Sequence, residues 1–199
     1  MTSPQAVLDF WFGELDANGA PIENKSPLWW GRSEETDAEI IARFGATAEA
    51  AANGELDHWA DTPSGAVALI ITLDQFPRNM YRGQSQAFAT DAKARTFTLA
   101  GIAAGNDQQM PFAHRVFFYI PLEHSEDRAL QAQSVELYAH LMETAPPALK
   151  EQAANYLDYA KHHRAIVDRF GHFPHRNDFL GRESTAEEIE FLTRPGSSF

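Results

Sequence analysis

The 199-residue chain contains no cysteine. It therefore cannot form a disulfide, use a thiolate nucleophile or build a zinc site on sulfur. Its strongest apolar run, residues 66–73, is far shorter than the roughly 18 residues from which a membrane helix is recognised. The first residues also lack a basic stretch before an apolar one, so neither export nor a membrane span is expected. These absences predict a cytoplasmic protein.

Positive charge is scarce as well. Lys and Arg number 16 against 28 Asp and Glu, and the net charge is −12. Such an acidic chain argues against general binding to nucleic acid or to anionic lipid. Basic residues nonetheless gather in two segments, residues 73–83 and residues 162–182, each with a net positive charge. Local basic spots on an acidic chain suggest either a small anionic ligand or internal ion pairs.

Several motifs of catalysis and cofactor binding are missing. The sequence has no His-Glu-x-x-His, no Gly-x-Ser-x-Gly and no Gly-rich phosphate or dinucleotide loop. Most histidines lie from His114 onward, but His172 and His175 span a Phe-Pro turn rather than the face of a helix. The sequence therefore predicts neither a metal nor a cofactor.

Most of the recognisable patterns in the sequence are typical of helices. No segment alternates apolar and polar residues with the period of a strand. Ser3 and Pro4 are typical of a helix start. Further helices are predicted over residues 34–52, 66–73, 91–104, 111–145 with a kink or restart at Pro121, and 148–170. A long irregular connection, residues 13–33, carries Trp29 and Trp30, which either fasten it to the core or belong to a ligand lid. The pattern predicts a single all-α domain over residues 1–199.

One short motif occurs twice. Phe-Pro-Arg-Asn stands at residues 76–79, and Phe-Pro-His-Arg-Asn stands at residues 173–177. Pro stops a helix and pushes the preceding residue out of the α region, so both copies should hold their cations at equivalent helix ends. The first copy follows an apolar helix that is expected at the centre of the domain, and Asp74 and Gln75 should therefore be at least partly buried.

In the last long predicted helix, residues 148–170, the spacing of the polar residues predicts which of them face the core. At about 100° per residue, His163 falls on the apolar side and His162 points away from it. Arg164 lies at the shoulder of the apolar face, one turn before Asp168, with which it can pair. If Arg164 is buried and paired, its replacement by Ala should destabilise the fold by ~3 kcal/mol or more.

Four longer motifs resemble the domain of unknown function 924 family. They lie at residues 73–79, 117–127, 169–177 and 195–199, and the similarity extends over essentially the whole chain. The resemblance implies antiparallel helix hairpins stacked in a tetratricopeptide-like right-handed array. It brings no established activity, substrate or catalytic residue. One departure is His172, where Arg is more usual, and this makes anion affinity at that point dependent on pH.

Charged side chains on apolar helices need partners, because taking an ion out of water is costly unless another charge compensates it. Two interpretations stay open, and so does the question whether the protein is an enzyme. In the first, arginines bind a small carboxylate or phosphate, and His124 or His163 could act as a general acid or base. The residues of this site would be Asp74, Gln75, Arg78, Asn79, Glu123, His124, His163, Arg164, His175, Arg176 and Asn177. In the second, the protein is a tetratricopeptide-like module that binds a protein or peptide, and the polar cluster is purely structural.

Overall fold

The computed structural model describes residues 2–198, and Met1 and Phe199 lie outside the described part. Within that range the chain forms helices and turns without a strand, so the prediction of an all-α fold is confirmed. The only β-type pairing between described residues is an isolated bridge between Leu15 and Pro21. None of the helices in this range is long and apolar enough to cross a membrane.

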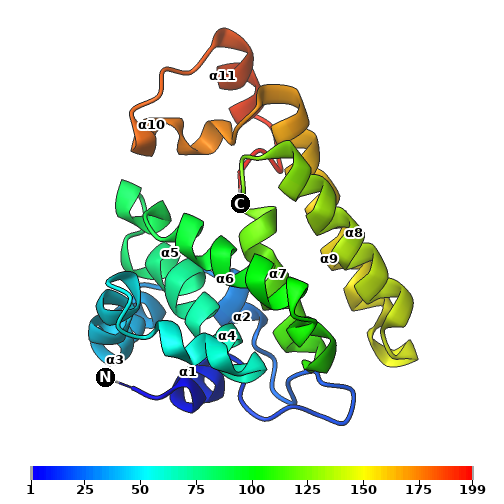
Figure 1. Cartoon of the computed structure of the whole chain (residues 1–199). Coiled ribbons are helices and arrows are strands. Elements are labelled where there is room, and N and C mark those ends of the chain that lie inside the picture. The colour runs from blue at the N-terminus through cyan, green and yellow to red at the C-terminus, as the bar shows by residue number, and fades with distance from the viewer. Residues whose placement is uncertain (1, 199) are drawn as a thin grey trace.

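The α-helices follow one another along the whole chain (Figure 1). They are α1 (Pro4–Trp11), α2 (Ser26–Trp30), α3 (Glu34–Ala52), α4 (Pro63–Ile70), α5 (Phe76–Met80), α6 (Asp91–Ala103), α7 (Phe112–Glu123), α8 (Arg128–Thr144), α9 (Lys150–Phe170), α10 (Asn177–Leu180) and α11 (Ala186–Leu192). Short 3-10 turns lie between them: η1 (Asp57–Asp61), η3 (Ser85–Phe88), η4 (Asn106–Gln109), η5 (Pro147–Leu149) and η6 (Pro174–Arg176). A π-helical turn, η2 (Ile71–Gln75), joins α4 to α5.

Several helices begin where polar side chains accept the first free backbone N–H groups. Ser3 accepts from the N–H of Ala6 at 3.2 Å, with proline in the first turn, as predicted. At the other end of the chain, Thr185 and Glu188 form a capping box at the start of α11. Helix α7 continues through Pro121 instead of restarting there.

Helix α4 and the turn η2 occupy the centre of the main core. Helix α4 packs against α1, α6 and α7, and every residue over 65–77 is buried. The central position predicted from the apolar run is thereby confirmed. Helices α8 and α9 form an antiparallel hairpin along one side (Figure 1). Tetratricopeptide-like stacking of the hairpins stays a prediction.

The connection over residues 13–33 is fastened to the core by Trp29. The indole N–H of Trp29 donates to the carbonyl of Trp11 at 2.9 Å, and its ring lies 4.8 Å from that of Phe117. Trp30 stacks on the same Phe117 at 5.7 Å, although 53% of Trp30 is exposed. The connection also contains the short helix α2, which the sequence did not indicate.

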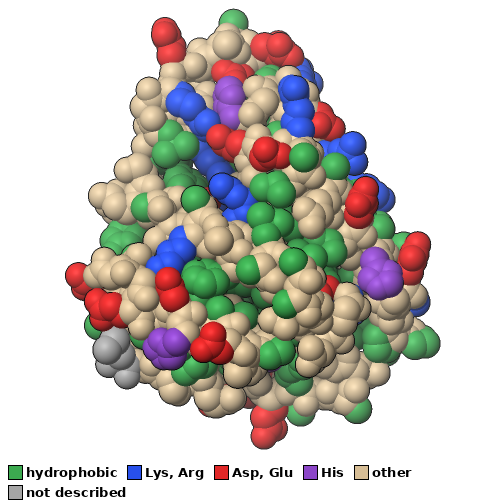
Figure 2. Space-filling model, viewed as in Figure 1, with side chains coloured by type: hydrophobic (Ala, Val, Ile, Leu, Met, Phe, Trp, Pro, Cys, Tyr) green, Lys and Arg blue, Asp and Glu red, His purple; other side chains and the backbone are tan. Residues whose placement is uncertain are grey.

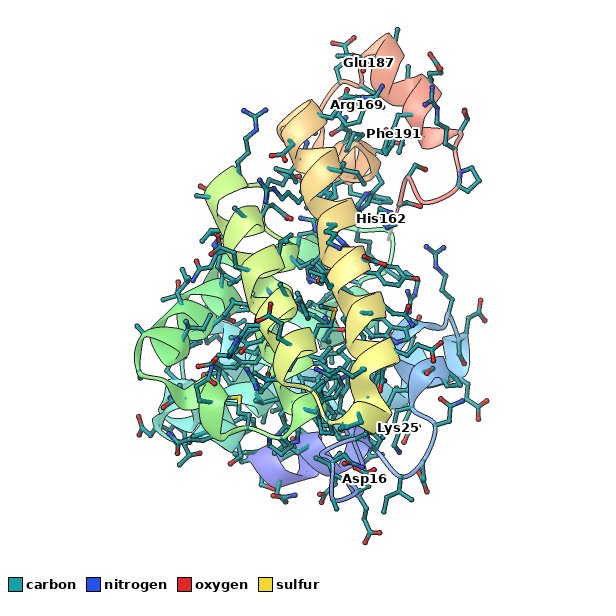
Figure 3. All side chains as sticks on the ribbon, turned by 90° about the vertical axis from the view of Figure 1, so that its right-hand side faces the viewer. Asp16, Lys25, His162, Arg169, Glu187 and Phe191 are labelled. Atoms are coloured by element: carbon teal, nitrogen blue, oxygen red, sulfur yellow. The ribbon has the colours of Figure 1, made fainter. Side chains whose placement is uncertain are left out.

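The C-terminal segment has a small apolar cluster of its own. Its members are Ile166, Val167 and Phe173, with Phe170 and Phe191 packed against them. Arg169 joins the end of α9 to α11 by donating to Glu187 at 2.6 and 2.9 Å (Figure 3). Two residues of the candidate site, His163 and Arg176, pack against Phe173 of this cluster.

Candidate functional site

The first Phe-Pro copy lies inside a helix rather than at its end. Phe76 has α-helical angles (φ −59°, ψ −42°), so the expectation that Pro77 pushes it out of the α region is wrong. The turn η2 explains the difference. The N–H of Phe76 donates to the carbonyl of Ile71, five residues back, and this wider turn makes room for the proline ring. The chain therefore continues as α5 through the motif.

Thr90, the residue before α6, donates a hydrogen bond to a backbone carbonyl that Pro77 leaves without a partner. Pro77 has no N–H, and its ring crowds the carbonyl four residues earlier, that of Leu73. The hydroxyl of Thr90 donates to this carbonyl at 2.5 Å. Because Asp91 follows directly, the contact also fixes the start of α6 against η2.

Asp74 lies in η2 with a side chain that is fully buried. Its carboxylate is 3.3 Å from Nη1 of Arg78 and accepts from Nε2 of Gln75 at 2.6 Å. Nδ1 of His124 is 3.0 and 3.1 Å from its two oxygens. Burial acts to raise the pKa of Asp74, but the Arg78 charge and the hydrogen bonds outweigh it and hold that pKa well below its ordinary value. Asp74 is therefore ionised at neutral pH.

Arg78 is compensated on all sides. It donates two parallel hydrogen bonds to Asp91, at 2.9 and 3.0 Å, and one to the backbone carbonyl of Asp74 at 2.6 Å. Burial acts to lower the pKa of Arg78, but Asp74 and Asp91 reverse the effect and raise it. Two carboxylates around one guanidinium leave Arg78 without surplus positive charge.

His124 is a neutral imidazole fixed in one tautomer. It follows the last residue of α7, and burial, then the Arg78 charge, lowers its pKa below the ordinary value. Because an ionised Asp74 can only accept hydrogen bonds, Nδ1 of His124 carries the hydrogen of their contact. The Nε2 lone pair is then left on the ring edge directed away from Asp74. This is the state that a general base needs.

Glu123 and His163 form a second buried pair. Oε1 of Glu123 and Nδ1 of His163 are 2.9 Å apart, and the same Nδ1 is 2.9 Å from the carbonyl of Tyr159. The ring of His163 lies 6.2 Å from that of His124. His163 is buried and His162 is exposed on the outward side of α9 (Figure 3), which confirms the prediction from spacing.

The second Phe-Pro copy begins a helical segment instead of continuing one. Gly171 (φ 78°) ends α9 in the left-handed conformation. Phe173 is extended (φ −92°, ψ 108°), as expected before proline, and Pro174 opens η6. The two copies therefore do not hold their arginines at equivalent helix ends, and this prediction is wrong.

Arg176 is a buried cation with incomplete compensation. Only 6% of it is exposed. Its Nη1 donates to the backbone carbonyl of His124 at 3.1 Å, and the same atom is 3.8 Å from Asp91, beyond hydrogen-bond distance. Its Nε is buried and has no partner within residues 2–198. Burial, followed by the Arg78 charge, lowers the pKa of Arg176 to about 10.

Aromatic rings surround the Arg176 guanidinium. Its central carbon is 4.5 Å from the ring centroid of Phe173 and 4.8 Å from that of Phe88. The ring of Phe179, in α10, lies 6.4 Å from that of Phe88. Figure 2 shows the surface hollowed between the C-terminal segment and the rest of the molecule, with Lys and Arg side chains gathered along the hollow.

Three other predicted residues serve local contacts or lie beside Arg176. Asn79 donates to the carbonyl of Gln75 at 3.1 Å, and Asn177 donates to the hydroxyl of Ser184 at 3.0 Å. His175 is half-buried, and burial, then the Arg176 charge, lowers its pKa to about 3. His172, the departure from the family pattern, lies 2.6 Å from Glu188.

Arg164 does not join the cluster. Its side chain is 44% exposed, and its one ion pair among the described residues is with Asp168, 3.3 Å away and 48% exposed. The pairing at one helical turn is as predicted, but the expected burial is wrong. Spacing gives the angle of a residue around its own helix, whereas burial depends on whether another element covers that angle.

Sequence reasoning missed two carboxylates. Asp91 lies between the two arginines of the cluster, but it is also the first residue of α6, where an acidic side chain is common simply because it stabilises the helix end. Glu126 accepts from Arg182 at 2.7 and 3.0 Å and from the N–H of Phe173 at 2.9 Å. It carries no signal in the sequence beyond its position in the segment over residues 117–127.

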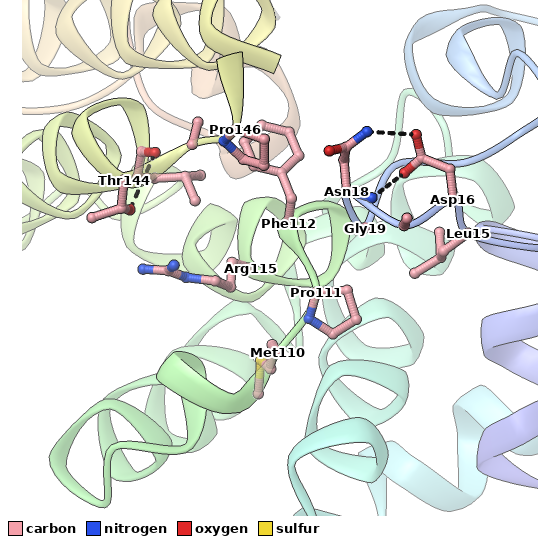
Figure 4. A pocket seen from close by; sticks show the side chains of 13 residues that line it. Leu15, Asp16, Asn18, Gly19, Met110, Pro111, Phe112, Arg115, Thr144 and Pro146 are labelled. Carbon is pink, nitrogen blue, oxygen red and sulfur yellow. Dashed lines mark hydrogen bonds between the residues drawn. The ribbon is translucent and has the colours of Figure 1, made fainter. Parts of the chain in front are cut away.

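A pocket of about 400 Å³ lies elsewhere, between the loop over residues 15–19, the start of α7 and the end of α8. Asp16 and Asn18 line one side of it, and Arg115 and Thr144 line the other (Figure 4). It shares no residue with the polar cluster. Within residues 2–198, no group of three or more His, Asp or Glu side chains is placed to hold a metal ion.

Comparison with known proteins gives a family without an assigned activity. Residues 7–196 match the model of DUF924, described as a bacterial protein of unknown function. A solved structure of a protein of unknown function from Agrobacterium tumefaciens is 37% identical, with a TM-score of 0.78 over 95% of this chain and 96% of that chain. None of the curated proteins matches. The family match covers both Phe-Pro copies and the whole polar cluster. The chain belongs to the DUF924 family of bacterial proteins of unknown function.

Proposed function

We propose that the protein binds a small anion, a carboxylate or phosphate, on the Nε side of Arg176. The observation that carries the proposal is the buried Nε, which has no partner among the described residues. Buried donors are almost always bonded, and a buried cation is costly without a counter-charge nearby. An anion at this position supplies both the acceptor and the charge.

The proposal divides the predicted site into two halves. Asp74, Arg78 and Asp91 satisfy one another, and their network joins η2, α5 and α6. This half supports the fold and positions His124. The half around Arg176 keeps an unused donor, and it is the half that receives the ligand.

Any acid–base chemistry on the bound anion would fall to His124 rather than His163. The backbone carbonyl of His124 already accepts from Arg176, so the two residues touch. Its side chain is 15% exposed, against 5% for His163. Asp74 fixes the ring and leaves Nε2 as the available base.

A tetratricopeptide-like module that binds a peptide is the alternative. It requires an open surface lined by exposed aromatic and charged side chains. Trp30 and Tyr159 are exposed, but they belong to different helices, α2 and α9, and neither accounts for the unused donor of Arg176. The anion site is therefore the better supported function. A cytoplasmic location also stays a prediction.

Isothermal titration with acetate and with phosphate tests the anion site. Arg176→Ala removes the donor, and Arg169→Ala is the matched control because Arg169 also stacks on a phenyl ring and pairs with a carboxylate outside the cluster. We expect binding, and a rise in Tm with ligand, for the wild type and Arg169→Ala but not for Arg176→Ala. Binding that survives in Arg176→Ala contradicts the proposal.

A further inference from the structure

We infer that the ligand is a carboxylate attached to a flat apolar group, as in an aromatic carboxylate, rather than a phosphate. The inference rests on the proposed anion site at Arg176 and adds the chemical class of its ligand. Three properties of the site carry it: the balance of charge, the edge of the guanidinium that makes no hydrogen bond in the described chain, and the apolar side chains near Arg176.

The balance of charge favours a monovalent anion. The paired charges around the site are Arg78, Arg176 and Arg182 against Asp74, Asp91 and Glu126. Glu123 adds a further carboxylate next to His163, and His124 is neutral. The cluster therefore has no surplus positive charge for the roughly −1.5 to −2 of a phosphate monoester at neutral pH. A carboxylate adds a single negative charge beside the arginine whose nearest carboxylate is 3.8 Å away.

The surroundings of Arg176 leave one edge of its guanidinium to a ligand. Nη1 is occupied by the carbonyl of His124, and the rings of Phe88 and Phe173 lie over the central carbon. The Nε–Nη2 edge remains, with Nε unpartnered in the described part of the chain. A carboxylate presents two oxygens to that edge in the guanidinium plane. The tetrahedral oxygens of a phosphate also project out of that plane, toward the rings.

Exposed apolar side chains follow Arg176 along the chain. Phe179 and Leu180 belong to α10, which begins directly after Arg176, and they are 40% and 41% exposed. The ring of Phe179 is 6.4 Å from that of Phe88, which itself packs on the arginine. Exposed apolar side chains beside a buried cation suit a ligand with an anionic end and a flat apolar body.

Titration of the wild type with sodium benzoate, acetate and phosphate tests this class directly. Cyclohexanecarboxylate serves as a ligand of similar size that is not flat. We expect benzoate to bind about tenfold more tightly than acetate, which corresponds to roughly 1.4 kcal/mol. Cyclohexanecarboxylate should fall between them, and phosphate should bind more weakly than benzoate.

Two variants test which residue binds the carboxylate of the ligand and which binds its apolar group. Arg176→Lys keeps the charge but removes the fork, and benzoate affinity should fall about tenfold or more. Phe179→Ala changes an exposed side chain and leaves the core intact. Phe179→Ala should lower the affinity for benzoate about threefold to tenfold and leave the affinity for acetate unchanged. Arg169→Lys lies outside the site and should change the affinity for neither benzoate nor acetate.

Each outcome separates the inference from the function on which it rests. Phosphate that binds more tightly than benzoate and depends on Arg176 overturns the carboxylate inference and leaves the anion site standing. Equal affinities for benzoate and acetate, or no effect of Phe179→Ala, overturn the apolar part. No binding that depends on Arg176 for any of the four ligands overturns the anion site as well.

Discussion

The two Phe-Pro copies contain nearly the same residues, yet they give their arginines different surroundings. Arg78 in the first copy makes a bidentate contact with Asp91 and lies 3.3 Å from Asp74. Arg176 in the second copy is more deeply buried but is 3.8 Å from its nearest carboxylate and has an unused Nε within the described chain. Arg78 is compensated by two carboxylates of the protein, whereas Arg176 keeps a buried donor without a hydrogen-bond partner in the described chain.

The residues before each proline produce this difference. The first copy follows a helix without interruption, and the π-helical turn η2 lets the chain continue as α5. The second copy follows Gly171, whose left-handed conformation ends α9 and leaves Phe173 extended. A repeated motif therefore does not imply a repeated conformation, because the backbone before the proline decides whether the helix continues through it.

The largest effect that this comparison predicts is on stability, in Arg78→Met. The change leaves Asp74 buried without its cation and removes both hydrogen bonds to Asp91. We expect the free energy of unfolding to fall by about 3 kcal/mol, the lower end of the range for a buried pair, because part of Arg78 reaches solvent. Urea denaturation at pH 7 measures it.

A neighbouring arginine provides the control for this variant. Arg82 makes the same bidentate contact, to Asp37 at 2.8 and 2.9 Å, but its side chain is 36% exposed. Arg82→Met should therefore lose only about 0.5 kcal/mol. If both variants lost the same free energy of unfolding, the burial of Asp74 would not strengthen its pairing with Arg78.

The second copy should make stability depend on pH through His175. The pKa of His175 is about 3 in the folded protein, lowered by burial and then by Arg176 from its ordinary 6.5. Below pH 6.5 the unfolded chain binds a proton that the folded chain does not, so stability present above pH 6.5 is lost as the pH falls toward 3. Between pH 6.5 and 5 the loss should be about 2 kcal/mol.

His175→Gln should remove the share of this dependence that His175 contributes, which urea denaturation at several pH values will show. His114 and His124, whose pKa values burial also lowers, keep their own shares. His162→Gln is the control, because His162 is exposed on α9. If the stability of His175→Gln falls with acid as steeply as that of the wild type, the histidine beside Arg176 is not the source.

Arg176→Met should cost far less stability than Arg78→Met. The variant loses one hydrogen bond, to the carbonyl of His124, and it also removes a poorly compensated cation from the interior. These effects oppose each other, and we expect a net loss of about 1 kcal/mol or less, again by urea denaturation. A loss as large as that of Arg78→Met would place Arg176 in the structural network and erase the contrast between the copies.

The helices could be predicted from the sequence because their signals are local. The spacing and punctuation give α3 its bounds over residues 34–52 and place α4 at the centre of the core. The turn η2 could not be predicted, because it depends on Thr90, far along the chain, to bond the carbonyl that Pro77 leaves free. Pro77 and Pro121 both lie within continuing helical segments, where the rule that proline ends a helix fails.

The meeting of Asp74, Arg78 and His124 could be anticipated, because charges on buried helices must find one another. Their partner Asp91 could not be, since an acid at a helix start already has a local explanation. The burial of Arg176 and the exposure of Arg164 are set by packing between elements, which the spacing along one helix does not encode.

Arg164 offers the smallest expected effect. Its side chain and that of Asp168 are both nearly half exposed, and their 3.3 Å contact spans one turn of α9. Such a pair is worth about 0.3–0.5 kcal/mol, and alanine regains part of that through its helix propensity. Arg164→Ala should therefore change the free energy of unfolding by less than about 0.5 kcal/mol in urea denaturation. The loss of ~3 kcal/mol expected from the sequence alone would require Arg164 to hold a buried partner in solution, and the polar cluster would then extend along α9 to include it.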